Sequence, residues 1–301
     1  MSLPLIYDDE TAARKHLEKL QWPDGPVCPR CGVVNEATKL KGESTRPGVW
    51  KCRPCQKPFS VTVGTVFEDS KVPLHKWLYA THLLTASKKG ISAHQLHRTL
   101  GVTYKTAWFM AHRIREAMRP TELTPMGGNG GIVEVDETYI GKQEGHTKGK
   151  GSAHKNIVLT LVERGGRARS FHIESFAIAQ VAPIVRQNVR RESKLMSDEA
   201  NQYKALGKEF ASHGAVEHSA YEYVRGEIHT NTIEGYYSIF KRGMKGIYQH
   251  CAEKHLHRYL SEFDFRYSNR VKLGVNDAQR ADKALEGIRG KRLMYRRPHE
   301  A

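Results

Sequence analysis

The chain has 301 residues, of which 48 are Lys or Arg and 32 are Asp or Glu, giving a formal net charge of +16 at neutral pH. This length allows two domains with separate cores, and the excess of positive charge predicts a polyanionic partner, nucleic acid before an acidic membrane surface. No apolar run approaches the roughly 18 residues of a membrane span, and the first 20 residues carry acids where a signal peptide is cationic and apolar. We therefore expect a cytoplasmic, nucleoid-associated protein with no membrane partner.

The first 120 residues are predicted to hold a helix, a cysteine-rich module and a helical region. Ala12, Leu17 and Leu20 recur near helical spacing after an acidic first turn, which predicts a leading helix within residues 1–21. Residues 22–67 are rich in Gly, Pro and Cys with short β-branched runs, so we expect hairpins held by something other than a large core. The helical region is placed at 68–120, with helices at 73–87, 92–99 and 103–118.

The rest of the chain is predicted to be a linker, a mixed α/β domain and a tail. The segment RPTELTPMGGNGG contains two prolines and four glycines, so a linker is predicted at 121–131. Residues 132–270 follow, and residues 271–301 are expected to form a basic, weakly structured tail. Strands are predicted from GIVEVDETYI, NIVLTLVERG, ARSFHIES and SKLMSD, and helices over about 176–191 and 230–270.

Four of the five cysteines form the pattern C-x2-C-x20-C-x2-C, at Cys28, Cys31, Cys52 and Cys55. Two tight knuckles with four soft thiolates match the ligand spacing of tetrahedral zinc. The alternatives are four unligated buried cysteines and a redox C-x-x-C, which would need a βαβ context. Because four protein ligands leave no open position for water, we expect this zinc to be structural.

The segment SAHQLHRTLGVTYKTAWFMAHRIREAM is typical of a helix-turn-helix. Ser92 and Thr103 are predicted to cap two helices, and Gly101 lies at the turn between them. A recognition helix would then lie at 103–115, although any basic amphipathic helical hairpin gives a similar pattern. The side chains predicted to face outward are Tyr104, Lys105, His112, Arg113 and Arg115, and those chosen as DNA-binding are Tyr104, Lys105, Arg113 and Arg115.

Acids interrupt the predicted strand GIVEVDETYI. Alternation places Val133, Val135 and Glu137 on one face and Glu134, Asp136 and Thr138 on the other. A carboxylate among apolar strand residues is unusual, because burying it without a partner costs several kcal/mol. Asp136 is therefore a candidate for binding a cation.

Two further segments supply candidate ligands. Asp198 follows the predicted strand KLMS directly. In HTNTIEGYYSIFKRG, a helix that begins near Asn231 places Asn231, Glu234 and Lys241 on its polar face. Carboxylates that converge on two divalent cations suit in-line phosphoryl transfer, with Mg²⁺ or Mn²⁺ as the metal. The alternative is that each acid is an ordinary solvated surface residue.

These motifs, in this order, resemble the zinc-ribbon DDE transposases of bacterial insertion sequences, the lineage related to the Merlin elements. The resemblance runs from about Asp9 to Arg270. Its marks include QWPDGPVCPRCG, CRPCQKPFSVTVGTVFEDSKVPLHKWLYA, VEVDETYIG, SDEANQY and HTNTIEGYYSIFKRGMKG. The resemblance implies a ribonuclease H-like catalytic domain, in which flanking helices cover a mixed sheet.

The resemblance also implies residue roles. Asp136 would be the first acid and Asp198 the second, 62 residues later. The third ligand is asparagine in some branches, and we choose Glu234 over Asn231 because a carboxylate binds Mg²⁺ more strongly than an amide does. Lys241 would contact a phosphate near the scissile bond, or else is an ordinary exposed lysine. The chain departs from the family pattern at Gly141-Lys142 and at Tyr236-Tyr237, neither of which is a proposed ligand.

The predicted function is a transposase that binds the inverted repeats of its element, frees a 3′-hydroxyl at each end and joins the ends to target DNA. Because two ends must be held together, we expect at least a dimer. One rival is a zinc-ribbon DNA-binding regulator without catalysis; another is a metal-dependent nuclease without strand transfer. A second metal site at Cys251, His255 and His257 is disfavoured, because a helix does not bring all three positions to one face.

Overall fold

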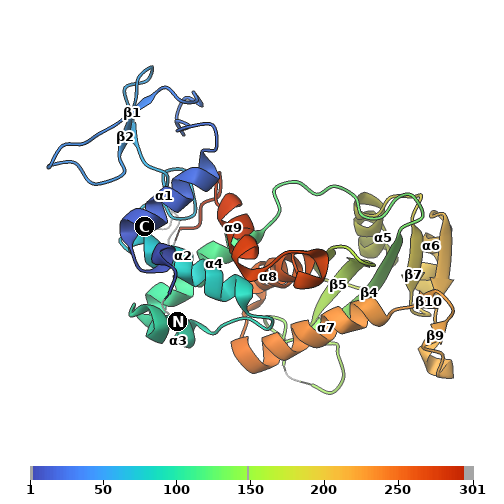
Figure 1. The fold of residues 1–301 in the computed structure, drawn as a ribbon. Helices are drawn as coiled ribbons and strands as arrows, with labels where there is room; N and C mark the ends of the chain where they lie inside the picture. The colour runs from blue at the N-terminus through green and yellow to red at the C-terminus, as the bar shows by residue number, and fades with distance from the viewer. Residues whose placement is uncertain (1–2, 148, 295–301) are drawn as a thin grey trace. The chain divides into compact units, whose positions relative to one another are not determined.

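The computed structural model describes residues 3–147 and 149–294, apart from the side chain of His218 (Figure 1). The described chain divides into two compact units. The first contains the residues up to Ser87, Ile91–Arg119 and the segment from Asn276 onward; the second contains Lys88–Gly90 and Pro120–Val275. No helix in the described ranges is long and apolar enough to span a membrane.

The first unit combines a small antiparallel sheet with helices. The strands β1 (Ala37–Lys39), β2 (Trp50–Cys52) and β3 (Pro58–Phe59) pair in that order. The sequence predicts the first four helices of this unit, three of which begin at a residue whose side chain caps the helix. Its first helices are α1 (Glu10–Gln21), α2 (Leu74–Ala86), α3 (Ala93–Leu100) and α4 (Tyr104–Met118).

The α3–α4 hairpin has the predicted caps. The Ser92 hydroxyl accepts from the backbone N–H of Gln95, and that of Thr103 accepts from the N–H of Thr106. Gly101 ends α3 with a φ of 60°, a left-handed conformation that glycine adopts without strain. The cap signals therefore fix both helix starts and the turn between them.

The expectation of a weakly structured tail after Arg270 is wrong for Asp277–Glu286, which form helix α9 of the first unit. This helix packs against α1, α2 and α4, where it buries Ala284 and Leu285. The Gln21 side chain donates to the Leu285 carbonyl at 2.6 Å. The sequence did not predict this helix, because its apolar stripe is narrow and most of its other residues are charged or polar. Residues 295–301 of the predicted tail lie outside the described residues.

The second unit is built on a five-stranded mixed sheet with the strand order β6-β5-β4-β7-β8. The pairs β4–β5 and β5–β6 are antiparallel, whereas β4–β7 and β7–β8 are parallel. Strand β4 is therefore central, and residues on it have neighbours on both sides. The strands are β4 (Ile132–Ile140), β5 (Asn156–Glu163), β6 (Ala168–Ile173), β7 (Lys194–Ser197) and β8 (Ser212–Ala215).

Helices cover both faces of this sheet. On one face, Val133 and Val135 pack with α5 (Ile178–Asn188) and α6 (Asn201–Gly207). On the other, Ile140 packs with α7 (Asn231–Gly243) and α8 (Leu256–Ser268). The predicted alternation along β4 is thus confirmed. Shorter elements are the hairpin β9 (Val224–Arg225) and β10 (Ile228–His229), the π-helical turn Met244–Tyr248, and short 3-10 turns at Leu5–Tyr7, His218–Ala220, Glu253–His255 and Val271–Leu273.

The predicted linker at 121–131 is not a free tether over its whole length. Met126 is fully buried, and its N–H donates to the carbonyl of Asn188 at 2.7 Å. The N–H of Gly127 donates to Glu163 at 3.0 Å. Proline and glycine here mark an irregular segment whose second half is bound to the sheet through backbone hydrogen bonds.

We predict that Leu285→Ala lowers the free energy of unfolding of the first unit by about 2–5 kcal/mol, through lost burial and the cavity left behind. All four tryptophans, Trp22, Trp50, Trp77 and Trp108, lie in this unit, so their fluorescence during urea unfolding reports on it. Glu286→Ala, at an exposed position of the same helix, is the control. Equal midpoints for the two variants would show that α9 does not stabilise the unit.

Candidate functional site

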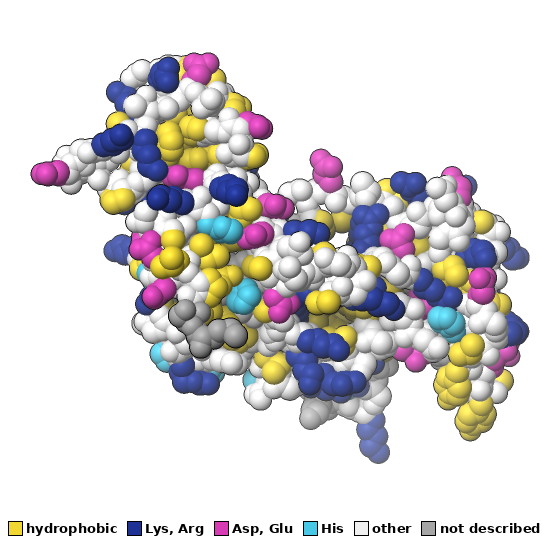
Figure 2. Space-filling view, in the orientation of Figure 1, with side chains coloured by type: hydrophobic (Ala, Val, Ile, Leu, Met, Phe, Trp, Pro, Cys, Tyr) yellow, Lys and Arg dark blue, Asp and Glu magenta, His cyan; other side chains and the backbone are white. Residues whose placement is uncertain are grey.

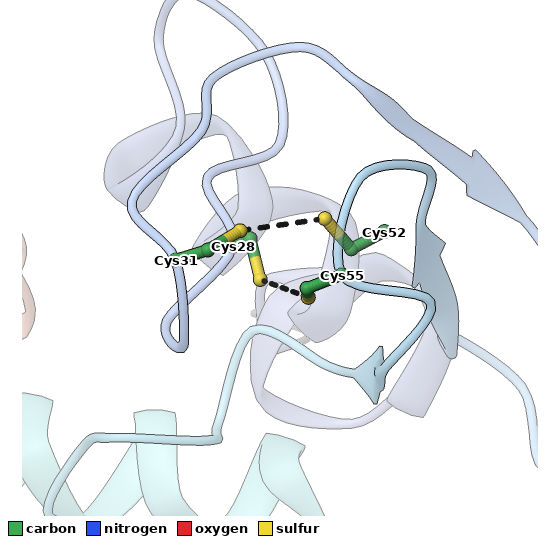
Figure 3. A group of neighbouring side chains, drawn as sticks. All are labelled: Cys28, Cys31, Cys52 and Cys55. Carbon is green, nitrogen blue, oxygen red and sulfur yellow. Dashed lines mark hydrogen bonds between the residues drawn. The ribbon is translucent and has the colours of Figure 1, made fainter.

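The four cysteines of the C-x-x-C pairs come together in the first unit. Their sulfur atoms all lie within 4.8 Å of one another. Figure 3 shows the side chains pointing toward a common centre from two loops, with Sγ of Cys28 at 3.7 Å from that of Cys55 and Sγ of Cys31 at 3.6 Å from that of Cys52. This set of four soft donors matches a closed tetrahedral zinc site.

The knuckle geometry prepares the Cys28 thiol to lose its proton. Burial alone would raise its pKa, but the backbone N–H groups of Cys31 and Arg30 act on the sulfur and lower the pKa to about 7. At Cys52 the N–H of Cys55 acts in the same direction, yet burial and the neighbouring sulfurs raise that pKa to about 12. Because four thiolates this close repel one another, the cluster needs a cation for all of them to ionise.

A second cluster of metal-ligand type lies in the other unit, where carboxylate oxygens of Asp136, Glu137 and Asp198 lie within 4.8 Å of one another. Strand β4 supplies the first two acids, and Asp198 follows the last residue of β7. Sequence analysis anticipates Asp136 and Asp198 but misses Glu137, because alternation assigns Glu137 to the opposite face of the strand.

The end of β7 explains how acids from opposite faces meet. Glu134 pairs with Met196 in the parallel register; Asp136 comes two residues after Glu134 on β4, and Asp198 comes two residues after Met196, directly past the end of β7. Since β7 ends at Ser197, β4 has no paired neighbour on that side beyond this point. Both β4 carboxylates reach this open edge, where the N–H of Glu137 donates to Oδ1 of Asp136 at 2.8 Å.

The two β4 acids of this cluster, Asp136 and Glu137, are held in conditions that disfavour their charges. Burial raises the pKa of Asp136 well above its ordinary value, and the charges of Glu137, Asp198 and Glu234 raise it further. Burial also raises the pKa of Glu137 to about 7, although the Tyr203 hydroxyl donates to its carboxylate at 3.0 Å and opposes the shift. A divalent cation would reverse this penalty, and hard carboxylate oxygens are the donors that Mg²⁺ and Mn²⁺ prefer.

Glu134, two residues before Asp136, is fully buried but neutralised. Its Oε1 accepts from Nε of Arg164 at 2.6 Å, and its Oε2 accepts from the backbone N–H of Ile233 at 2.9 Å. Ile233 lies in the first turn of α7, where unpaired N–H groups favour a negative charge. Glu134 is therefore structural, and it fixes the start of α7 beside the acidic cluster.

Helix α7 carries the remaining predicted ligands. Asn231 is its first residue and is exposed. Glu234 is also exposed, accepts from the Thr230 hydroxyl at 3.0 Å and acts electrostatically on Asp136. Nζ of Lys241 lies 5.7 Å from the centre of the Tyr237 ring. The helix thus brings Glu234 toward the cluster, while its assignment as the third ligand stays a prediction.

Tyr237 ties α7 to the acid-bearing strand. Its buried hydroxyl donates to the backbone carbonyl of Asp136 at 2.7 Å. The neighbouring Tyr236 donates to the half-buried Asp264 of α8 at 2.6 Å, and Ser170 on β6 donates to the same carboxylate at 2.8 Å. Burial raises the pKa of Asp264 to about 6 despite these donors. The Tyr-Tyr pair that departs from the family pattern therefore serves as a polar brace between helix and sheet.

On helix α4 of the first unit, several side chains that were predicted to form the DNA-binding face are oriented differently. Tyr104 and Lys105 are exposed at the start of α4, as expected. His112, Arg113 and Arg115 are buried instead, so the predicted outward orientation of these three is wrong. The Arg113 guanidinium donates to the carbonyls of Glu68 and Leu293. The sequence alone does not distinguish an arginine on the surface from a buried arginine that donates hydrogen bonds to backbone carbonyl groups.

The segment with Cys251, His255 and His257 forms no metal-binding group with other His, Cys, Asp or Glu side chains in the part of the chain that the structure describes. Nδ1 of His255 lies 2.9 Å from Nη1 of Arg258.

A cysteine module and a mixed sheet with an acidic centre thus occur in one chain, and each of the two segments matches a known protein family. Residues 129–268 match the ISXO2-like transposase domain, and residues 8–58 match the transposase zinc-ribbon domain. The chain is 26% identical over 274 residues to an "Uncharacterized protein in transposable element ISH50" of Halobacterium salinarum, over 85% of this chain and 90% of that protein. The chain belongs to the zinc-ribbon DDE transposases of insertion sequences.

We predict that the purified protein contains one zinc ion per chain and that Cys52→Ser loses it, since ligation supplies the folding free energy of such a small module. Trp22 and Trp50 pack against the cysteine cluster, so their fluorescence should change as residues 22–67 unfold. Cys251→Ser, outside the cluster, should retain both zinc and fluorescence. Cleanly folded protein without zinc by elemental analysis would refute a structural role for the metal.

Proposed function

We propose that this protein is a DNA transposase that binds the inverted repeats of its element, cleaves the ends to free 3′-hydroxyls and joins them to target DNA. The observation that supports catalysis most directly is the acidic cluster, whose three carboxylates lie within 4.8 Å of one another. Unlike Glu134, these acids have no Arg or Lys ion pair among the described residues. The mixed sheet with helices on both faces supports assigning a ribonuclease H-like fold to residues 132–270.

Asp136 is the central acid of the proposed site. Asp198 and Glu137 adjoin it at the open edge of β4, while Glu234 acts on it from α7. We assign Asp136, Asp198 and Glu234 as the principal ligands of Mg²⁺ or Mn²⁺, with Glu137 as an additional donor on the Asp198 side. When bound, the metal ions would activate the attacking water or 3′-hydroxyl and stabilise the leaving oxygen.

The other residues of α7 position the substrate and the acids. Lys241 lies on the same helix as Glu234, seven residues or about two turns further along, and is assigned to a phosphate next to the scissile bond. Tyr237 holds the Asp136 backbone through its carbonyl. Asn231, at the helix start, is assigned to orient a water or the helix end and not to bind metal, because its amide brings no charge.

We predict that Glu234→Gln reduces strand cleavage by at least about a hundredfold, on the order of 3 kcal/mol of transition-state stabilisation, while DNA binding persists. Glu137→Gln should also reduce cleavage, whereas Asn231→Ala should do less. The assay is incubation with Mg²⁺, labelled element ends and a plasmid target, in which cleaved and joined products are both scored. Near-normal cleavage by Glu234→Gln beside an inactive Asn231→Ala would reverse the assignment.

The same assay separates the proposed transposase from its rivals. A nuclease would give cleaved ends without joined product, and a regulator would bind the ends without cutting them. Because joining requires two ends in one complex, we also propose that the active form is at least a dimer. Inverted repeats that flank the coding sequence would favour transposition over both rivals.

We predict that Lys105→Ala weakens binding to element ends and reduces the slope of log K against log salt by about 0.9, the loss of one phosphate contact. Lys105 is exposed at the start of α4, whereas Arg113 is buried. Arg113→Ala should therefore lower the free energy of unfolding, through lost hydrogen bonds and packing. Lys15→Ala, an exposed charge on α1, is the matched control; an unchanged slope in Lys105→Ala would remove α4 from the DNA interface.

A further inference from the structure

A cavity of about 630 Å³ lies in the second unit, beyond the acidic cluster along β4. It is bounded by the end of β4, the start of β5 and the segment that follows α7. The buried side chains of Ile140, Met244 and Leu256 give it an apolar floor. Its size is in the range of small-molecule sites and exceeds what a single phosphate would fill.

Cations surround this floor. Lys142, Lys155 and Lys245 line the cavity, and none of its lining residues is an acid. Figure 2 shows Lys and Arg side chains gathered where, in Figure 1, the loop between β4 and β5 runs below α7. An apolar floor with a cationic rim suits a ligand that has a flat apolar body and a negative charge at one end.

Two polar atoms in the wall lack partners. Within the described residues, Oδ1 of Asn156 and Nδ1 of His154 are buried and have no hydrogen-bonding partner. Asn156 is 2% exposed, and its Nδ2 donates to the Lys142 carbonyl at 3.2 Å, which orients the amide. Buried polar atoms are rarely left unpaired in folded proteins, so these atoms indicate that a ligand with hydrogen-bonding groups belongs beside them.

The cavity is close to the acidic cluster. Tyr139 lines it, and burial together with the charges of Glu137, Asp136 and Asp198 raises the pKa of that tyrosine. Tyr139 lies three residues beyond Asp136 on the strand, about 10 Å at ~3.3 Å per residue. At the duplex rise of ~3.4 Å per nucleotide, about three nucleotides of one strand cover that distance.

We infer that this cavity binds one unpaired nucleotide of the DNA strand that passes through the acidic cluster. The base lies on the apolar floor with its polar edge toward Asn156, and the lysines hold the adjoining phosphates. A paired base has its edge occupied by its partner, so the nucleotide enters outside the duplex. The assignment of the strand as DNA rests on the proposed function, whereas the binding of a nucleotide rests on the cavity alone.

The test uses the full-length protein with EDTA, so that no cleavage occurs. A single-stranded 12-mer that contains 5-iodouracil is photo-crosslinked and the attached peptides are mapped; anisotropy measures affinity for the same strand and for its duplex. Ala252→Phe places a ring in the cavity from an exposed position. We expect about tenfold weaker single-strand binding, or roughly 1.4 kcal/mol, within the range for one stacked base. Crosslinks at Tyr139 and His154 should disappear, and duplex binding should change less than twofold.

Matched controls come from the same unit. Ala211→Phe, which adds a ring at an exposed position outside the cavity, is the control for Ala252→Phe. The double variant Lys204→Ala with Lys208→Ala removes two exposed charges outside the cavity. It is the control for the double variant Lys142→Ala with Lys245→Ala, which removes two charges from the cavity lining. Unchanged affinity and crosslinks in Ala252→Phe would overturn the inference, as would equal losses for strand and duplex. Preference for a ribo-oligonucleotide would overturn the assignment to DNA. Cavity-dependent binding by a protein that cuts no DNA with Mg²⁺ would refute the proposed function and leave the nucleotide site standing.

Discussion

The strand β4 places the fully buried Glu134 and the half-buried Asp136 two residues apart, and the difference in how their charges are compensated governs the second unit. Glu134 has Arg164 and the first turn of α7 as partners, so its negative charge stabilises the fold. Asp136 has other acids as neighbours instead, and its pKa rises because of burial first and their charges second. The fold thus pairs Glu134 with its own cationic and N–H groups, whereas Asp136 has no Arg or Lys ion pair among the described residues.

This arrangement also explains how α7 is positioned. Glu134 binds its first turn, and the Tyr237 hydroxyl binds the carbonyl of Asp136 itself, so the helix is fixed to the strand at two points. Tyr236 adds a third connection through the carboxylate of Asp264 on α8. Because hydrogen bonds have strict geometry, these contacts set the rotation of α7 about its axis, which apolar packing alone specifies less closely. That rotation decides which side chains of α7 reach the acids.

Much of this architecture was predictable from local patterns. Caps, alternation and cysteine spacing predicted α3, α4, β4 and the four-cysteine cluster, because each depends on residues close in sequence. Glu137 was missed because its approach to Asp198 depends on where the neighbouring strand ends, which is a property of the sheet. Arg113 was misplaced because its partners are carbonyl groups of residues 45 and 180 positions away. Tertiary partners of this kind leave no local signal.

Helix α9 has a consequence for how the protein is made. The first unit begins near the start of the chain but takes its last helix from residues 277–286, after the whole mixed sheet has been synthesised. On the ribosome, the apolar faces of α1, α2 and α4 therefore lack this partner until residues 277–286 have been synthesised. A prematurely terminated product would carry the acidic centre with an unfinished N-terminal unit. The order of the elements thus makes the folding of that unit depend on synthesis of the whole mixed sheet.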